Sequence, residues 1–180
     1  MQFRTRDTPE QIPPNLPRPE VALSPAMAAV VSGARRRALR DGDRHVDTAH
    51  LLHSLVESDI AVRDAFDGAP QLARVLGYLV QRSIGYGLRW QGVREDSGAV
   101  PVVRASGGEG LSAPAADALE RAGRDAARRG RPHADGLDLL TALLADPHCR
   151  AVEVLERAGV EAGRLAARAE SGRAAGEMSS

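Results

Sequence analysis

Two histidines three residues apart, His50 and His53, have a spacing that suits a metal ion. On a helix this spacing places both imidazoles on one face, close to the carboxylate of Asp47. A third histidine, His45, stands two residues before Asp47. A related segment later in the chain keeps only the counterpart of His45, which is His133, two residues before Asp135. A loop histidine followed by an aspartate that caps the next helix explains this recurrence without a metal ion. We therefore expect neither a bound metal nor a cofactor, and we retain His50 as a candidate contact for a partner.

Arginines gather in two segments, and their planar guanidinium groups can bind phosphates or carboxylates in a bidentate manner. Arg36 belongs to the first cluster and Arg124 to the second, and both are candidate contacts for a partner. The sequence has 24 arginines, no lysine and 24 acidic residues, so its formal net charge at pH 7 is zero. Zero net charge removes the broad attraction on which non-specific binding to nucleic acids and anionic membranes depends. Contact of Arg-rich helices with nucleic acid is therefore the alternative hypothesis, and we expect no membrane partner.

The remaining reactive groups form no recognisable catalytic set. The lack of lysine excludes a Schiff-base lysine and the phosphate-binding lysine of a P-loop ATPase. Cys149 is the only cysteine, which excludes an internal disulfide and favours a reducing compartment. The sequence has no run of about 18 apolar residues, and its N-terminal segment is polar and rich in proline. We expect a cytoplasmic protein that is not an enzyme.

An internal duplication positions these side chains. The segment that starts at Leu23 aligns without a gap to the segment that starts at Leu111. The identical pairs include Ser24/Ser112, Ala34/Ala122, Arg36/Arg124, Ala38/Ala126, Arg40/Arg128, Gly42/Gly130, His45/His133, Asp47/Asp135, Leu51/Leu139, Leu52/Leu140 and Leu55/Leu143. In each copy a serine followed by a proline predicts a helix start, a glycine predicts its end, and an aspartate caps a leucine-rich second helix. That second helix should be the buried centre of its copy.

The composition divides the chain into five stretches. Residues 1–20 contain five prolines and few apolar side chains, so we expect a flexible arm there. Residues 21–90 form the first repeat, 91–110 a linker rich in glycine and charge, 111–170 the second repeat, and 171–180 a flexible tail. Each repeat continues with a short third helix and a fourth helix, at about 71–88 and 161–170. With aromatic residues at only 3%, the predicted fold is all-α, with two tandem four-helix repeats.

The order of these features resembles the repeat of the N-terminal domain of Clp unfoldases. That repeat has a capped first helix, a glycine, a short polar loop and a D/G-T-x-H-L-L segment that opens a buried helix. The matching segments are VDTAHLLHSL in the first copy and the eroded ADGLDLLTAL in the second. The resemblance covers roughly residues 22–170 and implies a pseudo-twofold, all-α bundle. In the family, this bundle lies at the front of an AAA+ unfoldase and docks adaptors and substrates.

Some family members bind phosphorylated arginine through a threonine at the first helix cap and a glutamate just before the motif histidine. The matching positions here are Ser24 and Ala49 in the first copy, and Ser112 and Leu137 in the second. Both hydroxyl groups are kept, whereas both acidic positions hold apolar residues. The resemblance implies a non-catalytic, free-standing binding module that acts as an adaptor, decoy or sensor in Clp-dependent proteolysis. Its ligand would be a Clp unfoldase component, an adaptor, a client or a peptide-like compound.

Overall fold

The structure of the chain is a computed structural model, and it describes residues 23–84 and 110–178. The predicted arm at 1–20 and the predicted linker, apart from Gly110, lie outside the described residues. In the two described ranges, no helix combines the length and apolar character needed to cross a membrane.

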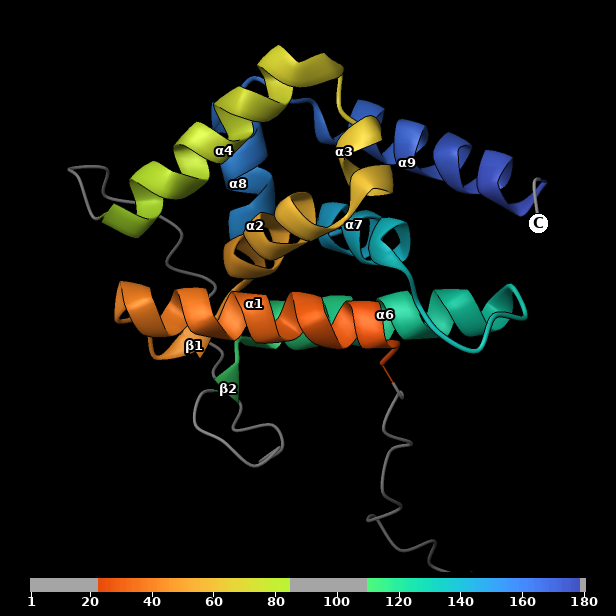
Figure 1. Ribbon diagram of the computed structural model, residues 1–180, viewed down its shortest axis with the longest axis horizontal. Helices are drawn as coiled ribbons and strands as arrows, with labels where there is room; N and C mark the ends of the chain where they lie inside the picture. Colours follow the sequence, from red (N-terminus) through yellow and green to blue (C-terminus); the bar gives the residue numbers. More distant parts are fainter. Residues whose placement is uncertain (1–22, 85–109, 179–180) are drawn as a thin grey trace, which may run out of the picture.

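The described residues form two successive sets of four helices (Figure 1). The first repeat contains α1 (Pro25–Asp41), α2 (Thr48–Ser58), α3 (Ile60–Asp64) and α4 (Gly68–Ile84). The second contains α6 (Ala113–Arg128), α7 (Gly136–Leu144), α8 (Arg150–Arg157) and α9 (Ala162–Glu177). Two-residue strands, β1 (His45–Val46) and β2 (Gly110–Leu111), precede α2 and α6. The predicted all-α fold of two four-helix repeats is confirmed.

The first helix of each repeat begins at the predicted serine cap. The hydroxyl groups of Ser24 and Ser112 accept hydrogen bonds from backbone N–H groups three residues later, at 3.2 and 3.3 Å. A proline stands in the first turn of both helices, where its missing N–H costs no hydrogen bond. Gly42 and Gly130 follow the helix ends with φ angles of 75° and 74°, a left-handed conformation that favours glycine. These local signals fix where both helices begin and end.

The second helices form the centre of the molecule. In Figure 1, α1 and α6 lie along one face, and α2 and α7 pack on them. The leucines predicted to be buried in α2 and α7 are at most 1% exposed, namely Leu51, Leu52, Leu55, Leu139, Leu140 and Leu143. The helices α3, α4, α8 and α9 cover the opposite side, and apolar residues of both repeats share one core. The prediction of buried second helices is confirmed.

The caps of the first helices also hold the two repeats together. The Ser24 hydroxyl donates to the carbonyl oxygen of Ala134 at 3.4 Å, in the loop that precedes the second helix of the other repeat. In the reciprocal contact, the Ser112 N–H donates to the carbonyl oxygen of Val46 at 2.9 Å. The strands β1 and β2 pair in parallel beside this second contact. Each first helix therefore begins against a loop of the other repeat.

The last helix is longer than the sequence indicated. Because α9 continues to Glu177, the second repeat does not end at residue 170, and residues 171–177 of the predicted flexible tail are helical. Within this extension Arg173 is 7% exposed, and its guanidinium donates to the Asp138 carboxylate at 2.7 Å. A buried ion pair thus anchors a segment whose small and polar residues predicted fraying. In the first repeat, α4 is described as far as Ile84, so the predicted continuation to residue 88 lies outside the described residues.

Candidate functional site

A buried ion cluster lies at the start of α2, around the predicted site residue His50. The His50 backbone N–H donates to the Asp47 carboxylate at 2.9 Å. The imidazole Nδ1 lies 3.1 Å from the Asp47 backbone nitrogen and 2.9 Å from its carboxylate, and Nε2 lies 3.2 Å from the Asp43 carboxylate. A neutral imidazole would accept the Asp47 N–H and complete a capping box, whereas a charged one donates to both carboxylates.

The surrounding charges favour the imidazolium form. Burial lowers the pKa of His50, but the hydrogen bonds to Asp43 and Asp47 outweigh it and raise the pKa to about 9. Burial raises the pKa of Asp47, but His50, Arg82 and Arg150 hold it well below its usual range. Asp47 accepts a hydrogen bond from Arg150 at 2.8 Å and forms a close ion pair with Arg82. At pH 7 the cluster therefore consists of charged groups that neutralise one another.

This arrangement does not favour a metal ion. Ligand atoms of the two carboxylates and the imidazole lie within 4.8 Å of one another. Two guanidinium groups already neutralise Asp47, however, and a bound cation would have to displace them. The other histidine of the spaced pair, His53, places Nε2 3.0 Å from a carboxylate oxygen of Glu57. The two imidazoles therefore bind different carboxylates and do not form a shared ligand pair.

The second repeat builds the equivalent cluster with an acid in place of the histidine. Asp135 and Asp138 form the capping box at the start of α7. The side chain of Asp138 is 0% exposed and binds Arg131 at 2.6 Å and Arg173 at 2.7 Å. Burial raises the pKa of Asp138, but a hydrogen bond from the Asp135 backbone and the two arginines lower it overall. Each repeat thus encloses one buried carboxylate within a set of cations.

The arginines of these clusters are not among the site residues predicted from the sequence. The fourth helix of each repeat supplies one, Arg82 from α4 and Arg173 from α9, to the capping box of its own repeat. The gapless alignment ends before the fourth helices, where the two repeats are shifted against each other, so it cannot pair these residues. The available signal was indirect, because a carboxylate that caps a buried helix requires a cation nearby.

The five predicted site residues do not meet in one place. Ser112 and His50 are 3% and 2% exposed, and both serve helix caps. Ser24 is partly buried at the cap of α1, roughly 18 Å along the helix axis from Arg36. Arg36 and Arg124 are exposed on the first helices. Of the five residues, only these two arginines are exposed, whereas Ser24 is partly exposed.

The positions matched to the acidic residues of phosphoarginine-binding family members are apolar and buried. Ala49 is 0% exposed in α2, and Leu137 is 7% exposed in α7. A phosphoarginine guanidinium would find no carboxylate at either position. We therefore do not propose the phosphoarginine site of the family for this chain.

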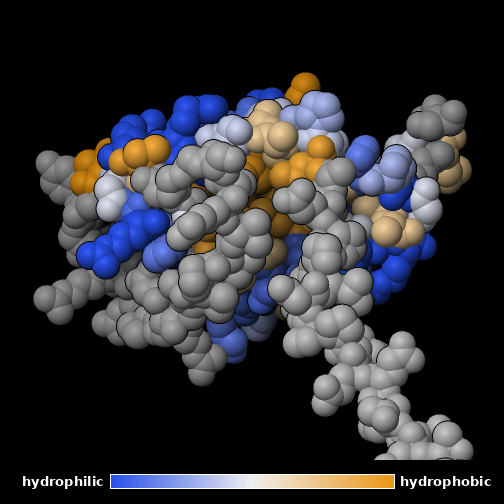
Figure 2. Space-filling model, turned by 90° about the horizontal axis from the view of Figure 1, so that it is seen from below, coloured by the Kyte–Doolittle hydropathy of each residue, from blue (hydrophilic) through white to orange (hydrophobic). Residues whose placement is uncertain are grey.

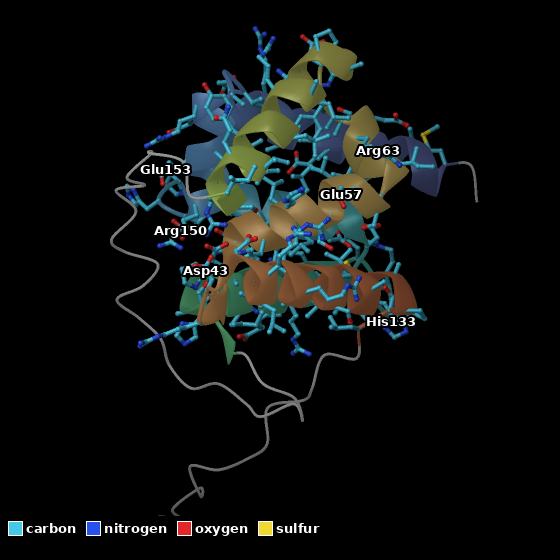
Figure 3. The ribbon with its side chains drawn as sticks, turned by 60° about the vertical axis from the view of Figure 1, so that its left-hand side comes forward. Asp43, Glu57, Arg63, His133, Arg150 and Glu153 are labelled. Carbon is cyan, nitrogen blue, oxygen red and sulfur yellow. The ribbon has the colours of Figure 1, made fainter. Side chains whose placement is uncertain are left out.

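A basic groove runs between α1 and α2, here named the α1–α2 groove. It has a volume of about 460 Å³ and is lined by Ala29, Gly33, Arg36, Arg37, Arg40, Ser54, Glu57 and Ser58. Gly33 permits the close approach of the two helices, because a Cβ atom there would lie 2.2 Å from Ser54 Oγ. Arg37 donates to the Gly33 carbonyl oxygen at 3.3 Å and forms a close ion pair with Glu57. Figure 3 shows Glu57 on α2, above α1.

An apolar edge formed by Val80 and Ile84 of α4 lies beside this groove, and we call it the α4 rim. A neighbouring hollow shares Arg37, Arg40 and Glu57 with the groove and adds Asp41, His53, Ser83 and the apolar residues Val80 and Ile84. These two apolar side chains are 44% and 60% exposed. The combined surface therefore offers exposed cations next to exposed aliphatic groups.

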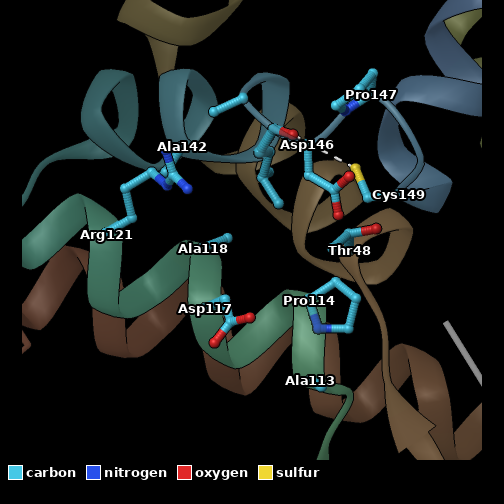
Figure 4. A pocket seen from close by; sticks show the side chains of 12 residues that line it. Thr48, Ala113, Pro114, Asp117, Ala118, Arg121, Ala142, Asp146, Pro147 and Cys149 are labelled. Atoms are coloured by element: carbon cyan, nitrogen blue, oxygen red, sulfur yellow. Dashed lines mark hydrogen bonds between the residues drawn. The ribbon is translucent and has the colours of Figure 1, made fainter. Parts of the chain in front are cut away.

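The second repeat has a hollow in the equivalent place, the α6–α7 pocket of Figure 4, with a volume of about 390 Å³. Asp117, Arg121, Ala142 and Asp146 line it at the positions of Ala29, Gly33, Ser54 and Ser58. Cys149, also in the lining, is 2% exposed, and its thiol donates to the Leu143 carbonyl oxygen at 3.4 Å. This pocket thus combines two carboxylates, one arginine and a buried thiol.

No protein-family model matches the chain, and no curated protein does. Several solved structures do. The N-terminal domain of the caseinolytic protease-associated chaperone ClpD from Arabidopsis thaliana is 17% identical, with a TM-score of 0.57 over 83% of this chain and 92% of that one. The Hsp104 N-terminal domain from Candida albicans is 13% identical, with a TM-score of 0.60 over 82% of this chain and 88% of that one. A structure from preliminary structural investigations of a malarial protein secretion system is 16% identical, with a TM-score of 0.58 over 83% of this chain and 92% of that one.

At these identities the likeness concerns the fold. The matching structures cover 82–83% of the chain. The resemblance indicated by the two copies of the motif is confirmed at this level. The chain has the fold of the Clp and Hsp104 N-terminal domains.

Proposed function

We propose that this chain is a non-catalytic binding module that docks a protein segment or a peptide-like ligand. The observation that carries the proposal is the likeness to the Clp and Hsp104 N-terminal domains over 82–83% of the chain. As such a module it would act in the cytoplasm as an adaptor, decoy or sensor in Clp-dependent proteolysis. Its partner would be a Clp unfoldase component, an adaptor or a client.

Two reactive groups, His50 and Cys149, are buried, which argues against a catalytic role for them. A general base or a nucleophile has to reach its substrate. The His50 imidazole is 2% exposed and is held by carboxylates, and the Cys149 thiol is 2% exposed and hydrogen-bonded. Neither group is accessible to a substrate.

The exposed faces of the first helices support a docking role. Arg36 and Arg124 are exposed there, and Leu39 of α1 is 61% exposed. Figure 2 shows mostly hydrophilic side chains among the described residues on one face, with separate small hydrophobic patches between them. Such a surface suits contacts that combine charge-assisted hydrogen bonds with small apolar areas.

The test is a reconstituted degradation assay with the Clp unfoldase and protease of the organism that encodes this chain. A fluorescent unfolded client is degraded with and without the purified chain. A decoy would slow degradation, whereas an adaptor would accelerate it. The Leu51→Ala/Leu139→Ala double variant, which loses core packing in both repeats, is the control for an effect that needs the folded module. An unchanged rate, together with no association with the unfoldase or the client, would contradict the proposal.

Contact with nucleic acid is the second candidate, because α1 carries four arginines and one acidic residue. Binding to phosphates weakens steeply as salt increases, whereas docking through apolar contacts does not. Two features weigh against a continuous phosphate track. Glu57 lies in the α1–α2 groove, and the arginines of α6 are matched by an equal number of acids.

A further inference from the structure

The two first helices differ in how their arginines are neutralised. The arginines of α6 have acidic neighbours on the same helix, with Arg124 3.6 Å from Glu120 and Arg128 3.4 Å from Asp125. Pairs of this type on an exposed helix face occupy each guanidinium with a nearby carboxylate. With three arginines and three acids, α6 carries no net charge, and Arg121 is the one of its arginines for which the described residues show no ion pair.

In α1 the balance differs, because four arginines share the helix with a single acid, Asp41. Ser32 stands where α6 has its glutamate, and within the described part of the chain Arg36 pairs with no carboxylate. Arg40 is 67% exposed, and its Nε lies 3.7 Å from Asp41, whose carboxylate also accepts a hydrogen bond from Ser83 at 2.9 Å. Residues four apart on a helix lie on the same face, about 6 Å from each other. Arg36, which has no carboxylate partner among the described residues, and Arg40, which is exposed and has one carboxylate contact at 3.7 Å, thus lie one helical turn apart along the α1–α2 groove.

The single acid that lines this groove is already neutralised. Burial raises the pKa of Glu57, but the ion pair with Arg37 lowers it overall, so this carboxylate stays charged and bound. Ser58 lies on the opposite wall and donates its hydroxyl to the Ser54 carbonyl oxygen at 2.8 Å. The net charge of the lining residues is positive, since three arginines and one glutamate line the groove, and Arg40 has its carboxylate contact outside this lining, with Asp41.

We propose that the α1–α2 groove binds an acidic peptide segment. Two carboxylates of the segment, spaced by one helical turn, bind Arg36 and Arg40, and an apolar side chain next to them packs on Val80 and Ile84 of the α4 rim. The site deepens the proposed function, on which it rests, by naming the chemistry of the docked segment. Charge complementarity selects the acidic residues, and the exposed aliphatic rim selects the apolar one.

A peptide fits this surface better than a nucleic acid does. A nucleic-acid strand carries a negative charge at every phosphate, so part of it would meet the Glu57 carboxylate and part of it the apolar rim. A peptide carries charges only where its acidic residues stand and can present an aliphatic group beside them. The groove and the α4 rim place cations beside apolar groups, which matches the acidic and aliphatic side chains of such a peptide.

The test uses fluorescence anisotropy with the full chain and three labelled probes. The probes are a short peptide rich in glutamate and leucine, the same peptide with glutamine in place of glutamate, and a single-stranded DNA oligonucleotide. The variant that removes the site is Arg36→Gln/Arg40→Gln. Its matched control, Arg124→Gln/Arg128→Gln, removes the arginines at the same positions of the second repeat. All four arginines are exposed, so thermal melting should show that both variants stay folded.

We expect the wild-type chain to bind the acidic peptide and not its glutamine counterpart. The first double variant should weaken that binding by about tenfold or more, because two charge-assisted contacts are lost, whereas the control should stay within about twofold. Equal losses in both variants would overturn the proposal, since the site would not belong to the first repeat. Tighter binding of the oligonucleotide, or no binding of the acidic peptide, would overturn it as well.

The degradation assay separates failure of this site from failure of the proposed function. If the wild-type chain and the Arg36→Gln/Arg40→Gln variant alter client degradation equally, the chain acts as a binding module through another surface, and the groove proposal is overturned. If the variant loses both peptide binding and the effect on degradation, the groove is the docking site.

Discussion

The α1–α2 groove and the α6–α7 pocket occupy the same place in the two repeats, yet they offer different chemistry. The groove has a glycine, three arginines, a glutamate and two serines, whereas the pocket has one arginine and two aspartates. The helices that form both hollows start at matching caps, Ser24 and Ser112 for the first helices and Asp47 and Asp135 for the second. The comparison shows that the shared backbone sets where a hollow lies, and that the substitutions lining it set what it can bind.

The capping boxes of the second helices show the same relation at a smaller scale. In the first repeat the cap residue, Asp47, is the buried carboxylate, whereas in the second repeat Asp135 is exposed and Asp138 is buried. Both arrangements enclose one carboxylate with cations, and both include an arginine from the fourth helix. The position of the buried charge moved by three residues while the fold stayed the same.

The largest expected effect tests this displacement of the buried charge. Asp47→Ala removes the partner of Arg82 and Arg150 and should lower the free energy of unfolding by about 3–5 kcal/mol, as expected when one member of a buried ion cluster is lost. Asp135→Ala, at the matching position, removes mainly a helix cap and should cost about 1 kcal/mol. Urea denaturation of the two variants measures both values, and equal losses would contradict the assignment of the buried charge.

The shared framework predicts equal effects at matching core positions. Leu51→Ala and Leu139→Ala should each lower the free energy of unfolding by about 2–5 kcal/mol, because both side chains are fully buried and each truncation leaves a cavity. Thermal and urea unfolding can compare the pair directly. A near-neutral result at one of the two positions would show that its helix is not central to the core.

The alkaline response of stability should come from the first repeat, where the box contains a histidine. Since the pKa of His50 is raised to about 9 in the folded chain, its contribution is fully present below the unfolded value of about 6.5 and is lost as pH rises through 9. The loss should reach at most about 3 kcal/mol. On the acidic side, the lowered pKa of Asp47 gives stability that is lost as pH falls below about 4.

Unfolding free energies of the wild type and of His50→Gln, measured from pH 6 to 10, check the alkaline part of this prediction. The variant should be less stable at neutral pH and should lose the decline near pH 9. A decline of the same size in His50→Gln would assign it to another group.

The smallest expected effect sharpens the contrast between the two hollows. Glu57→Gln removes the one acid from the α1–α2 groove and releases Arg37, so binding of the acidic peptide should strengthen by about two- to fivefold. The exposed position of Glu57 keeps the cost in stability small. Anisotropy titrations at low salt measure the change, and weaker binding by this variant would argue that Glu57 itself contacts the ligand.

Local signals allowed much of the fold to be predicted from the sequence. Serine caps, glycines at helix ends and runs of leucine act over a few residues, and the duplication allowed each one to be checked against its copy. The ion clusters depend on distant residues, since Arg82 reaches Asp47 from 35 positions away and Arg150 from 103. The groove depends on the packing of Gly33 against Ser54, which no local pattern encodes. For this reason Arg36 was identified as a candidate, while the cavity beside it was not.

The reciprocal caps of the first helices have a consequence for folding and ancestry. The bond from Ser24 to Ala134 spans 110 positions, so a loop of that length must close before it can form, and this closure should slow folding. One repeat expressed alone would lack the loop against which its first helix begins. Two such polypeptides could restore both contacts by associating symmetrically, which is the arrangement expected of a homodimeric ancestor whose gene was later duplicated and fused.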